Sequence, residues 1–296
     1  MTFAGVLARL SEPAEAQRMR DDPTTRLPSA LIAADWLRAH IPDVRILDVR
    51  SAADYERAHI PGAQWVAFDR VLTGTPQPSG ARRPLPGAAD FAASMKRVGI
   101  SDASVVVVYD DARGSRAARL WWMLDSLGLS CGVLDGGFAS WNDECELGST
   151  RSSLSAPPLS PKTFTARAWP PSHFVDVDEL AKKGDSALVL DARSSARFHG
   201  ELSPLDPRPG HIPKALSAPW TENVSTKDGR LLPLPLLRTQ FTSLGLRPDS
   251  EALLYCGSGV TACHNALVLR LLGVHPRVYV GSWSEWASDP ARPIET

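Results

Sequence analysis

The chain has few cysteines and almost no excess charge. Four cysteines occur among its 296 residues, at positions 131, 145, 256 and 263. No two of them form a CxxC pair, and no cysteine and histidine cluster has zinc spacing, so the sequence predicts neither a metal site nor another cofactor. The formal net charge is −1, which gives no electrostatic support for a nucleic-acid partner.

Long hydrophobic runs are also missing. The apolar stretch from Ala266 to Val274 contains Arg270 and is too short to span a bilayer, so no membrane partner is expected. Arg9 and Glu12 interrupt a short apolar run at the N-terminus, which argues against a signal peptide. With so few cysteines, these absences predict a cytoplasmic protein whose thiols stay reduced.

The most informative feature is an internal repeat. Four segments of the first half recur in the same order in the second half, and three of the pairs lie 143 to 146 residues apart. The histidine pair lies 152 residues apart, which predicts a longer loop in the second half. Four ordered matches indicate a duplication. The pairs are Val44–Arg50 with Ala187–Arg193, His59–Ala63 with His211–Ala215, Val107–Asp110 with Leu253–Cys256, and Leu134–Trp141 with Tyr279–Trp286.

Each half is predicted to alternate strands and helices. Short apolar runs flanked by Gly, Asp and Pro are typical of buried parallel strands. Their alternation with helices predicts a doubly wound, mostly parallel α/β sheet in each half. We expect strands at 44–48, 105–109, 132–135, 187–191, 251–255 and 277–280, and helices near 29–40, 88–98, 115–127, 234–244 and 260–272.

The repeat also predicts the domain organisation. Residues 1–28 are interpreted as an N-terminal extension and 29–147 as a first domain. A segment rich in Ser, Pro and Thr, 148–172, is predicted to link it to a second domain at 173–296. Each domain has an ordinary size and can bury its own core.

One loop of the second half combines the features of a reactive site. Residues Tyr255 to Ala262 follow a predicted strand and lead into a helix, which is where open parallel sheets bind ligands. Gly257 and Gly259 allow the backbone to curl so that its amides point inward, and the helix start adds the positive end of its dipole. Cys256 is therefore expected to be largely thiolate and able to carry a persulfide. The alternative interpretation is a small buried core residue.

The first half contains the matching loop without the thiol. Asp110 stands where the second half has Cys256, and an aspartate cannot hold a transferable sulfur. The first domain is therefore expected to be inactive in transfer while still shaping the pocket. Cys263 lies about two helical turns after Cys256 and is expected in the core.

The loop from Cys256 to Ala262, together with the His-Ile-Pro and Gly-Ser-Trp segments, resembles the tandem-domain rhodanese family, and specifically its 3-mercaptopyruvate sulfurtransferase type. The resemblance covers both halves from about Ser29 onward. It implies an inactive N-terminal and a catalytic C-terminal rhodanese-like domain, with the site in the crevice between them. It also implies a small anionic sulfur donor, 3-mercaptopyruvate, and an acceptor thiol or cyanide; a thioredoxin-like protein is one candidate acceptor.

The resemblance implies roles for further residues. Arg197 and Arg208 look like the arginines that hold the donor's carboxylate and carbonyl, for which a bidentate guanidinium gives a physical reason. Ser258 and His59 look like a pair that transfers a proton across the domain interface, with Asp54 as a candidate supporting carboxylate. The loop residues expected to contact substrate are Gly257, Gly259, Val260 and Thr261.

Three alternatives stay open at this point. Thiosulfate:cyanide transfer at the same cysteine ranks second, because relatives that prefer thiosulfate carry basic residues where this chain has Gly257 and Ser258. A cysteine phosphatase or arsenate reductase would need an arginine to close the loop, and the next arginine is Arg270. A non-catalytic sulfur-binding or interaction module is disfavoured by the intact second loop.

Overall fold

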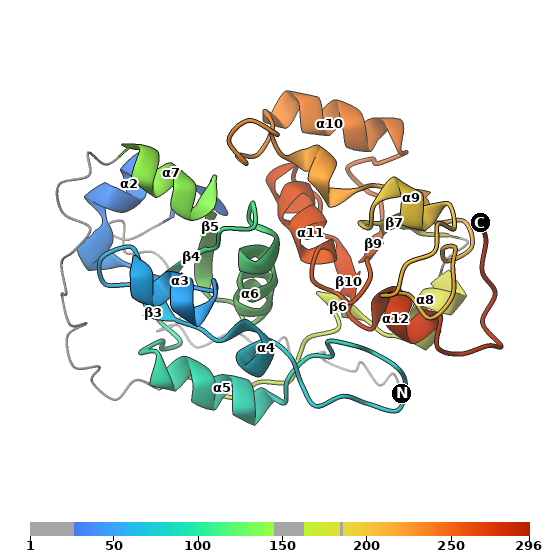
Figure 1. Ribbon diagram of the computed structural model, residues 1–296, viewed down its shortest axis with the longest axis horizontal. Helices are drawn as coiled ribbons and strands as arrows, with labels where there is room; N and C mark the ends of the chain where they lie inside the picture. The colour runs from blue at the N-terminus through green and yellow to red at the C-terminus, as the bar shows by residue number, and fades with distance from the viewer. Residues whose placement is uncertain (1–26, 145–162, 184–185) are drawn as a thin grey trace, which may run out of the picture.

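The computed structural model describes residues 27–144, 163–183 and 186–296. Almost all of the predicted extension and much of the predicted linker lie outside these residues, as does Cys145. The described chain forms two α/β units, and each contains one parallel sheet (Figure 1).

The two sheets have the same strand order. The first follows the order β1-β5-β4-β2-β3 and the second the order β6-β10-β9-β7-β8, with every neighbouring pair parallel. This equivalence confirms the predicted doubly wound fold and its duplication. The strands are β1 (Leu31–Ile32), β2 (Arg45–Asp48), β3 (Gln64–Trp65), β4 (Val105–Tyr109), β5 (Ser130–Leu134), β6 (Phe174–Val175), β7 (Leu188–Asp191), β8 (Leu216–Ser217), β9 (Ala252–Tyr255) and β10 (Arg277–Tyr279).

Helices follow most strands. The longest, α6, is buried along most of its length because it packs against β4 and β5 on one side and α11 on the other. The helices are α2 (Ala34–Ala39), α3 (Ala52–Arg57), α4 (Phe68–Val71), α5 (Ala88–Arg97), α6 (Ser115–Ser126), α7 (Gly137–Glu144), α8 (Val177–Lys183), α9 (Ser195–Phe198), α10 (Leu234–Ser243), α11 (Ala262–Leu271) and α12 (Ser282–Trp286), with short 3-10 turns at Ile41–Asp43 and Trp220–Asn223.

The first predicted helix needs correction. The segment 29–40 contains the short strand β1 before α2 begins, because Leu31 and Ile32 pair in parallel with Val133 and Leu134 of β5. Two-residue strands such as β1 and β3 have no detectable periodicity in the sequence. The sheet neighbour, rather than local propensity, determines them.

The two units share a hydrophobic core. Helices α6 and α11 lie side by side between the sheets (Figure 1). One cluster of buried side chains includes Trp121 and Leu124 of α6 together with Leu267 and Val268 of α11. Burial of such side chains contributes about 1.5–3 kcal/mol each, so this packing fixes one domain against the other.

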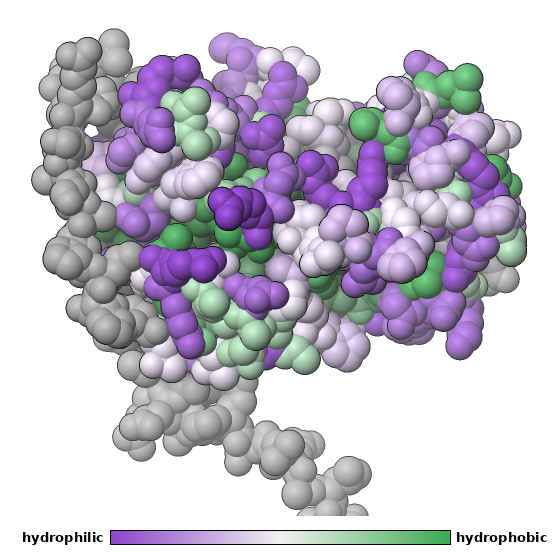
Figure 2. All heavy atoms as spheres, turned by 60° about the horizontal axis from the view of Figure 1, so that its bottom comes forward, coloured by the Kyte–Doolittle hydropathy of each residue, from purple (hydrophilic) through white to green (hydrophobic). Residues whose placement is uncertain are grey.

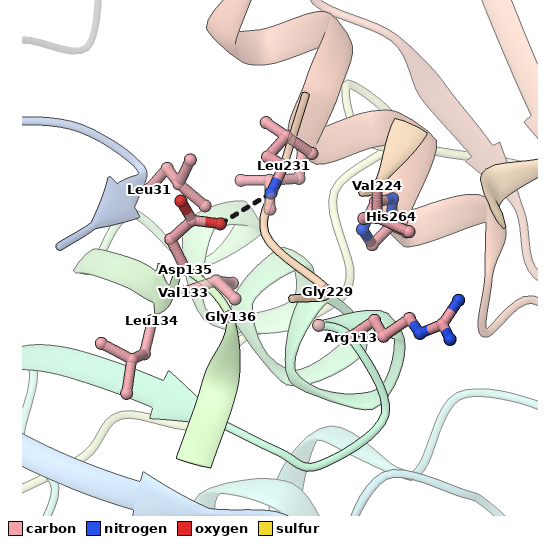
Figure 3. Close-up of a pocket in the computed structure, with 12 residues that line it drawn as sticks. Leu31, Arg113, Val133, Leu134, Asp135, Gly136, Val224, Gly229, Leu231 and His264 are labelled. Carbon is pink, nitrogen blue, oxygen red and sulfur yellow. Dashed lines mark hydrogen bonds between the residues drawn. The ribbon is translucent and has the colours of Figure 1, made fainter. Parts of the chain in front are cut away.

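Polar contacts also cross the domain boundary. The carboxylate of Asp135 accepts a 2.8 Å hydrogen bond from the amide of Leu231, beside a small cavity lined by residues of both units, including Arg113 and His264 (Figure 3). Burial raises the pKa of Asp135, and the Leu231 amide opposes that rise. The cavity is too small for an organic ligand, at about 10 Å³.

One face of the molecule is mostly polar. The face in Figure 2 carries hydrophilic side chains over most of its area, with smaller hydrophobic groups between them. No described helix has the length and apolar character that a membrane crossing requires.

Candidate active site

A cleft of about 620 Å³ lies at the carboxyl ends of the central strands, between the two domains. Its second-domain wall includes Cys256, Gly257, Ser258, Val260 and Thr261, so the structure brings these predicted residues together. Arginines from both domains line it, and Asp69 is the one acidic lining residue among the described residues. The arginines are Arg50, Arg70, Arg82, Arg83, Arg116 and Arg197. The cleft is therefore suited to an anionic ligand.

Cys256 follows β9 directly and is 2% exposed. The first turn of α12 holds its loop: the amide of Trp283 donates to the carbonyl of Cys256 at 2.9 Å, and the amide of Ser284 donates to that of Gly257 at 3.1 Å. These bonds fix the backbone around the thiol.

Ser282 is a neighbour of the thiol that the sequence analysis did not single out. Its Oγ accepts a 3.2 Å hydrogen bond from the amide of Cys256 and lies 3.9 Å from the Cys256 Sγ, while it donates to the carbonyl of Tyr279 at 2.8 Å. The Gly-Ser-Trp segment contains this serine, but the motif alone does not separate a scaffold role from a contact with the thiol.

The first-domain loop demonstrates what its amides can bind. The buried Asp110 carboxylate accepts four backbone hydrogen bonds of 2.8–2.9 Å, from Ala112, Gly114, Arg116 and Ala117. Burial raises the pKa of Asp110, and these four amides oppose the rise. The loop is thus a complete anion-binding turn that its own side chain occupies.

The second-domain loop has the same kind of turn, but its backbone amides have no acceptor among the described residues. Gly259 adopts φ +73, and Arg113, which stands at the same distance after Asp110 as Gly259 does after Cys256, adopts φ +55. A Cβ at Gly259 would lie 2.5 Å from the carbonyl oxygen of Val280, so this position requires glycine. Among the described residues, no acceptor takes the amide hydrogens of residues 257 to 262.

Arg197 of α9, one of the two arginines predicted to hold the donor, lies next to the loop. Its Nε and Nη2 donate to the carboxylate of Asp206 at 2.8 and 2.5 Å. A Cβ built on Gly257 would lie 2.9 Å from Arg197 Nη2 and 2.8 Å from Nη2 of Arg82. Arg82 belongs to the first domain and was not identified in the sequence analysis. Nothing in the sequence around it indicates which distant loop it contacts.

Arg208 is placed differently. Its guanidinium donates to the backbone carbonyls of Ala287, Asp289 and Arg292 at 2.8–3.1 Å, and its own carbonyl accepts from Trp283 Nε1. It is not among the residues that line the cleft. The structure therefore does not bring Arg208 together with Cys256.

His59 and Asp54 also lie outside the cleft lining. The His59 ring stacks on Tyr55 with centroids 4.1 Å apart, and its Nδ1 is 2.9 Å from the Tyr55 carbonyl oxygen. Asp54 bonds with Ser51 and Arg57, and the Ser51 hydrogen bond is the largest cause of its lowered pKa. The structure places Ser258 on the cleft without bringing His59 to it.

The repeat copy of this histidine, His211, is arranged like His59. It stacks on Phe198 at 3.7 Å and its Nδ1 lies 2.8 Å from the carbonyl oxygen of that residue. In both domains the following isoleucine amide donates to a buried tyrosine hydroxyl, Ile60 to Tyr109 and Ile212 to Tyr255. This shared arrangement favours a structural role for both histidines.

A buried arginine of the first domain donates a hydrogen bond to the loop. Arg119 of α6 is 1% exposed and donates from Nη1 to the carbonyl of Gly259 at 2.8 Å. Burial lowers the pKa of Arg119, and it raises that of the neighbouring Cys263 thiol to about 12. Cys263 is therefore a protonated core residue at neutral pH. In the described part of the chain no group of three or more His, Cys, Asp or Glu side chains could hold a metal ion.

Known proteins provide an independent comparison. The family model described as "Rhodanese-like domain" matches residues 33–144 and 175–289. A probable 3-mercaptopyruvate sulfurtransferase of Pseudomonas aeruginosa is 42% identical over 90% of this chain and 98% of its own. A putative thiosulfate sulfurtransferase of Mycobacterium tuberculosis is 33% identical over 79% of this chain and 81% of its own. The structure of 3-mercaptopyruvate sulfurtransferase from Leishmania major superposes with a TM-score of 0.75 at 30% identity, covering 90% of this chain and 76% of that one.

Proposed function

Because the chain belongs to the rhodanese-like domain family, with two such domains in tandem, we propose that it is a 3-mercaptopyruvate sulfurtransferase that carries the sulfur on Cys256. Relatives of that activity align over nearly the whole chain. The observation that carries the proposal is the position of Cys256, at the end of β9 in a cleft lined by arginines, beside a loop with unused amides.

The reaction has two covalent steps. The Cys256 thiolate attacks the sulfur of 3-mercaptopyruvate, a sulfur–sulfur bond forms, and the carbon–sulfur bond breaks. Its electron pair stays with the carbon and gives the enolate of pyruvate, which takes up a proton. An acceptor thiolate then attacks the outer sulfur and regenerates the Cys256 thiolate.

The first-domain loop supports the persulfide intermediate. In a persulfide side chain the outer sulfur is the second heavy atom beyond Cβ. Each carboxylate oxygen of an aspartate is likewise the second heavy atom beyond Cβ. The outer sulfur anion of a Cys256 persulfide would therefore reach about as far into its turn as the Asp110 oxygens reach into theirs. There it would meet amides that stabilise negative charge.

Arg197 is the proposed carboxylate ligand because it lies over Gly257, next to the thiol. Ser258 lines the cleft and is the proposed proton donor to the enolate. The proposal gives His59 and Arg208 no direct contact with the donor, since neither lines the cleft.

The acceptor is proposed to be a small thiol or a thioredoxin-like protein. A cytoplasmic location accords with the free state of the three described cysteines.

Thiosulfate transfer at the same cysteine is the second candidate. It is favoured by the two guanidinium groups that meet over Gly257, which could bind an oxyanion donor. Measuring kcat/KM for 3-mercaptopyruvate and for thiosulfate decides between the two donors, and we expect the higher value for 3-mercaptopyruvate.

The test of the proposal is donor-dependent pyruvate release by the wild type, by Cys256→Ser and by the matched variant Cys263→Ser. Wild type and Cys263→Ser should release pyruvate and gain one sulfur atom on the peptide that contains residue 256, as measured by mass spectrometry. Cys256→Ser should do neither. Pyruvate release by Cys256→Ser at the wild-type rate would refute the assignment.

A further inference from the structure

Two guanidinium groups from different domains meet above the residue that follows the thiol. A Cβ at Gly257 would lie 2.8 Å from Nη2 of Arg82 and 2.9 Å from Nη2 of Arg197. Both arginines line the cleft. Two like charges repel each other, and a ligand anion placed between these two groups would reduce that repulsion.

Arg82 is held in place by the catalytic domain. Its amide donates to Oγ of Ser284 at 3.1 Å, and its Nη1 donates to the carbonyl of Leu205 at 2.7 Å. Ser284 also donates its own amide to the carbonyl of Gly257. One residue of α12 thus fixes both the Arg82 backbone and the loop over which its guanidinium lies.

The guanidinium of Arg82 has spare hydrogen-bonding capacity. Its Nε is buried and has no hydrogen-bond partner among the described residues. No carboxylate of the described chain lies within ion-pair distance of it. A buried donor without an acceptor is costly. The Nη2 group, which donates no hydrogen bond to a described residue, lies over Gly257 and is the group that a ligand anion would meet.

The charged groups around Arg82 carry more positive than negative charge. Asp206 pairs with Arg197 at 2.5 Å and with Arg193 at 3.4 Å, and Arg193 pairs with Asp191 at 2.6 Å. With Arg82 added, three guanidinium groups therefore face two carboxylates. Burial lowers the pKa of Arg82, the charge of Arg197 lowers it further, and Asp206 and Cys256 oppose both effects.

We propose that Arg82 is a donor-binding residue that holds the carboxylate of the sulfur donor together with Arg197. The inference rests on the proposed function and adds to it a site that the two domains complete jointly. The donor's carboxylate lies between the two guanidinium groups while its sulfur faces Cys256. The domain that lacks a reactive thiol thereby contributes directly to substrate recognition.

The kinetic test compares Arg82→Gln and Arg82→Lys with the wild type and with Arg97→Gln, a control on α5 outside the cleft. Removing a charged hydrogen-bond partner predicts a rise of about tenfold or more in the KM for 3-mercaptopyruvate in Arg82→Gln. The kcat should change less than threefold, Arg82→Lys should recover part of the loss, and Arg97→Gln should match the wild type.

The methyl ester of 3-mercaptopyruvate separates carboxylate binding from a structural effect. The ester lacks the negative charge, so wild type and Arg82→Gln should have similar KM values for it. A KM for 3-mercaptopyruvate within twofold of the wild type in Arg82→Gln would overturn the inference. An equal loss with the acid and with the ester would also overturn it.

Binding of pyruvate provides a measurement that does not depend on turnover. Isothermal titration calorimetry can follow a pyruvate titration of each variant. We expect a Kd about tenfold higher in Arg82→Gln than in the wild type. If the wild type failed to release pyruvate from 3-mercaptopyruvate, the proposed function would fail, and equal pyruvate affinity in the two proteins would separately overturn the role of Arg82.

Discussion

The hydroxyl of Ser282 lies 3.9 Å from the sulfur of Cys256 and accepts the hydrogen bond of the Cys256 amide. Ser282 adopts a left-handed conformation with φ +55. The equivalent position in the first domain has the same conformation but is a glycine, Gly137, with φ +59. A side chain in this conformation costs roughly 1–3 kcal/mol. Its contact with the reactive residue gives a physical reason for a serine at this position.

We therefore expect Ser282→Gly to lose activity without losing stability. The substitution relieves the left-handed strain and removes two hydrogen bonds, one from the Cys256 amide and one to the Tyr279 carbonyl. These effects oppose each other, so the free energy of unfolding should stay within about 1 kcal/mol of the wild type. The kcat/KM for 3-mercaptopyruvate should fall about tenfold because the thiol loses its polar neighbour. Wild-type kcat/KM would contradict this prediction.

The opposite exchange, Gly137→Ser, is the matched comparison. A Cβ at Gly137 would lie 2.3 Å from the carbonyl oxygen of Asp110. This variant should unfold at a clearly lower denaturant concentration than the wild type, measured by circular dichroism.

Asp110→Asn should destabilise the first domain. An amide group presents a hydrogen-bond donor to amides that now donate to a carboxylate oxygen, so at least one buried donor loses its acceptor. We expect a loss of about 2–4 kcal/mol in the free energy of unfolding. Asp111→Asn, at the neighbouring and exposed position, should change it by less than about 0.5 kcal/mol. Equal stabilities of the two variants would show that the Asp110 carboxylate does not hold its loop.

His264 should make stability depend on pH. Burial lowers its pKa to about 4 from an ordinary value of 6.5, and a hydrogen bond to the Arg113 backbone only partly opposes this. Between these two values the unfolded state binds more protons, so stability rises with pH and is lost as the pH falls from about 6.5 to 4. The contribution is up to about 3 kcal/mol.

The measurement is urea unfolding of wild type and His264→Gln at several pH values from 4.5 to 7.5. The variant should be less stable at neutral pH, and its stability should fall less steeply with acid because it lacks this titration. Parallel stability curves for the two proteins would rule out the contribution of His264.

Gly257→Ala should weaken donor binding. The added methyl group would displace the guanidinium groups of Arg82 and Arg197, both under 3 Å from its position. We expect the KM for 3-mercaptopyruvate to rise about tenfold while the free energy of unfolding changes by less than about 1 kcal/mol. Gly87→Ala is a suitable control, since its methyl group would meet only the Asp90 side chain. An unchanged KM in Gly257→Ala would show that the two arginines do not bind the donor where they now lie.

The fold was predictable from the sequence where its signals are local. Long buried segments such as β4 and α6 were placed at or within one residue of their observed bounds, because an apolar run and a following helix are visible in the sequence. The duplication supported each assignment by an independent copy. The edge strand β1 was missed because its two residues become a strand only through pairing with β5.

The candidate site was predictable only in part. The loop from Cys256 to Thr261 carries its own signal, a thiol and two glycines between a strand and a helix. Arg82 meets Leu205 and Ser284, residues more than 120 positions away, and no local pattern encodes that contact. For Arg208 and His59 the predicted roles came from the family resemblance, whereas in the structure their side chains interact with backbone carbonyls.

The hydrophobic cluster that joins α6 to α11 makes each domain depend on the other for covering its apolar surface. Truncation to the catalytic half would expose Leu267, Val268 and their neighbours to water, so that half on its own would tend to aggregate or recruit a substitute partner. The first domain, although it has Asp110 in place of a thiol, therefore covers apolar surface that the catalytic half would otherwise expose.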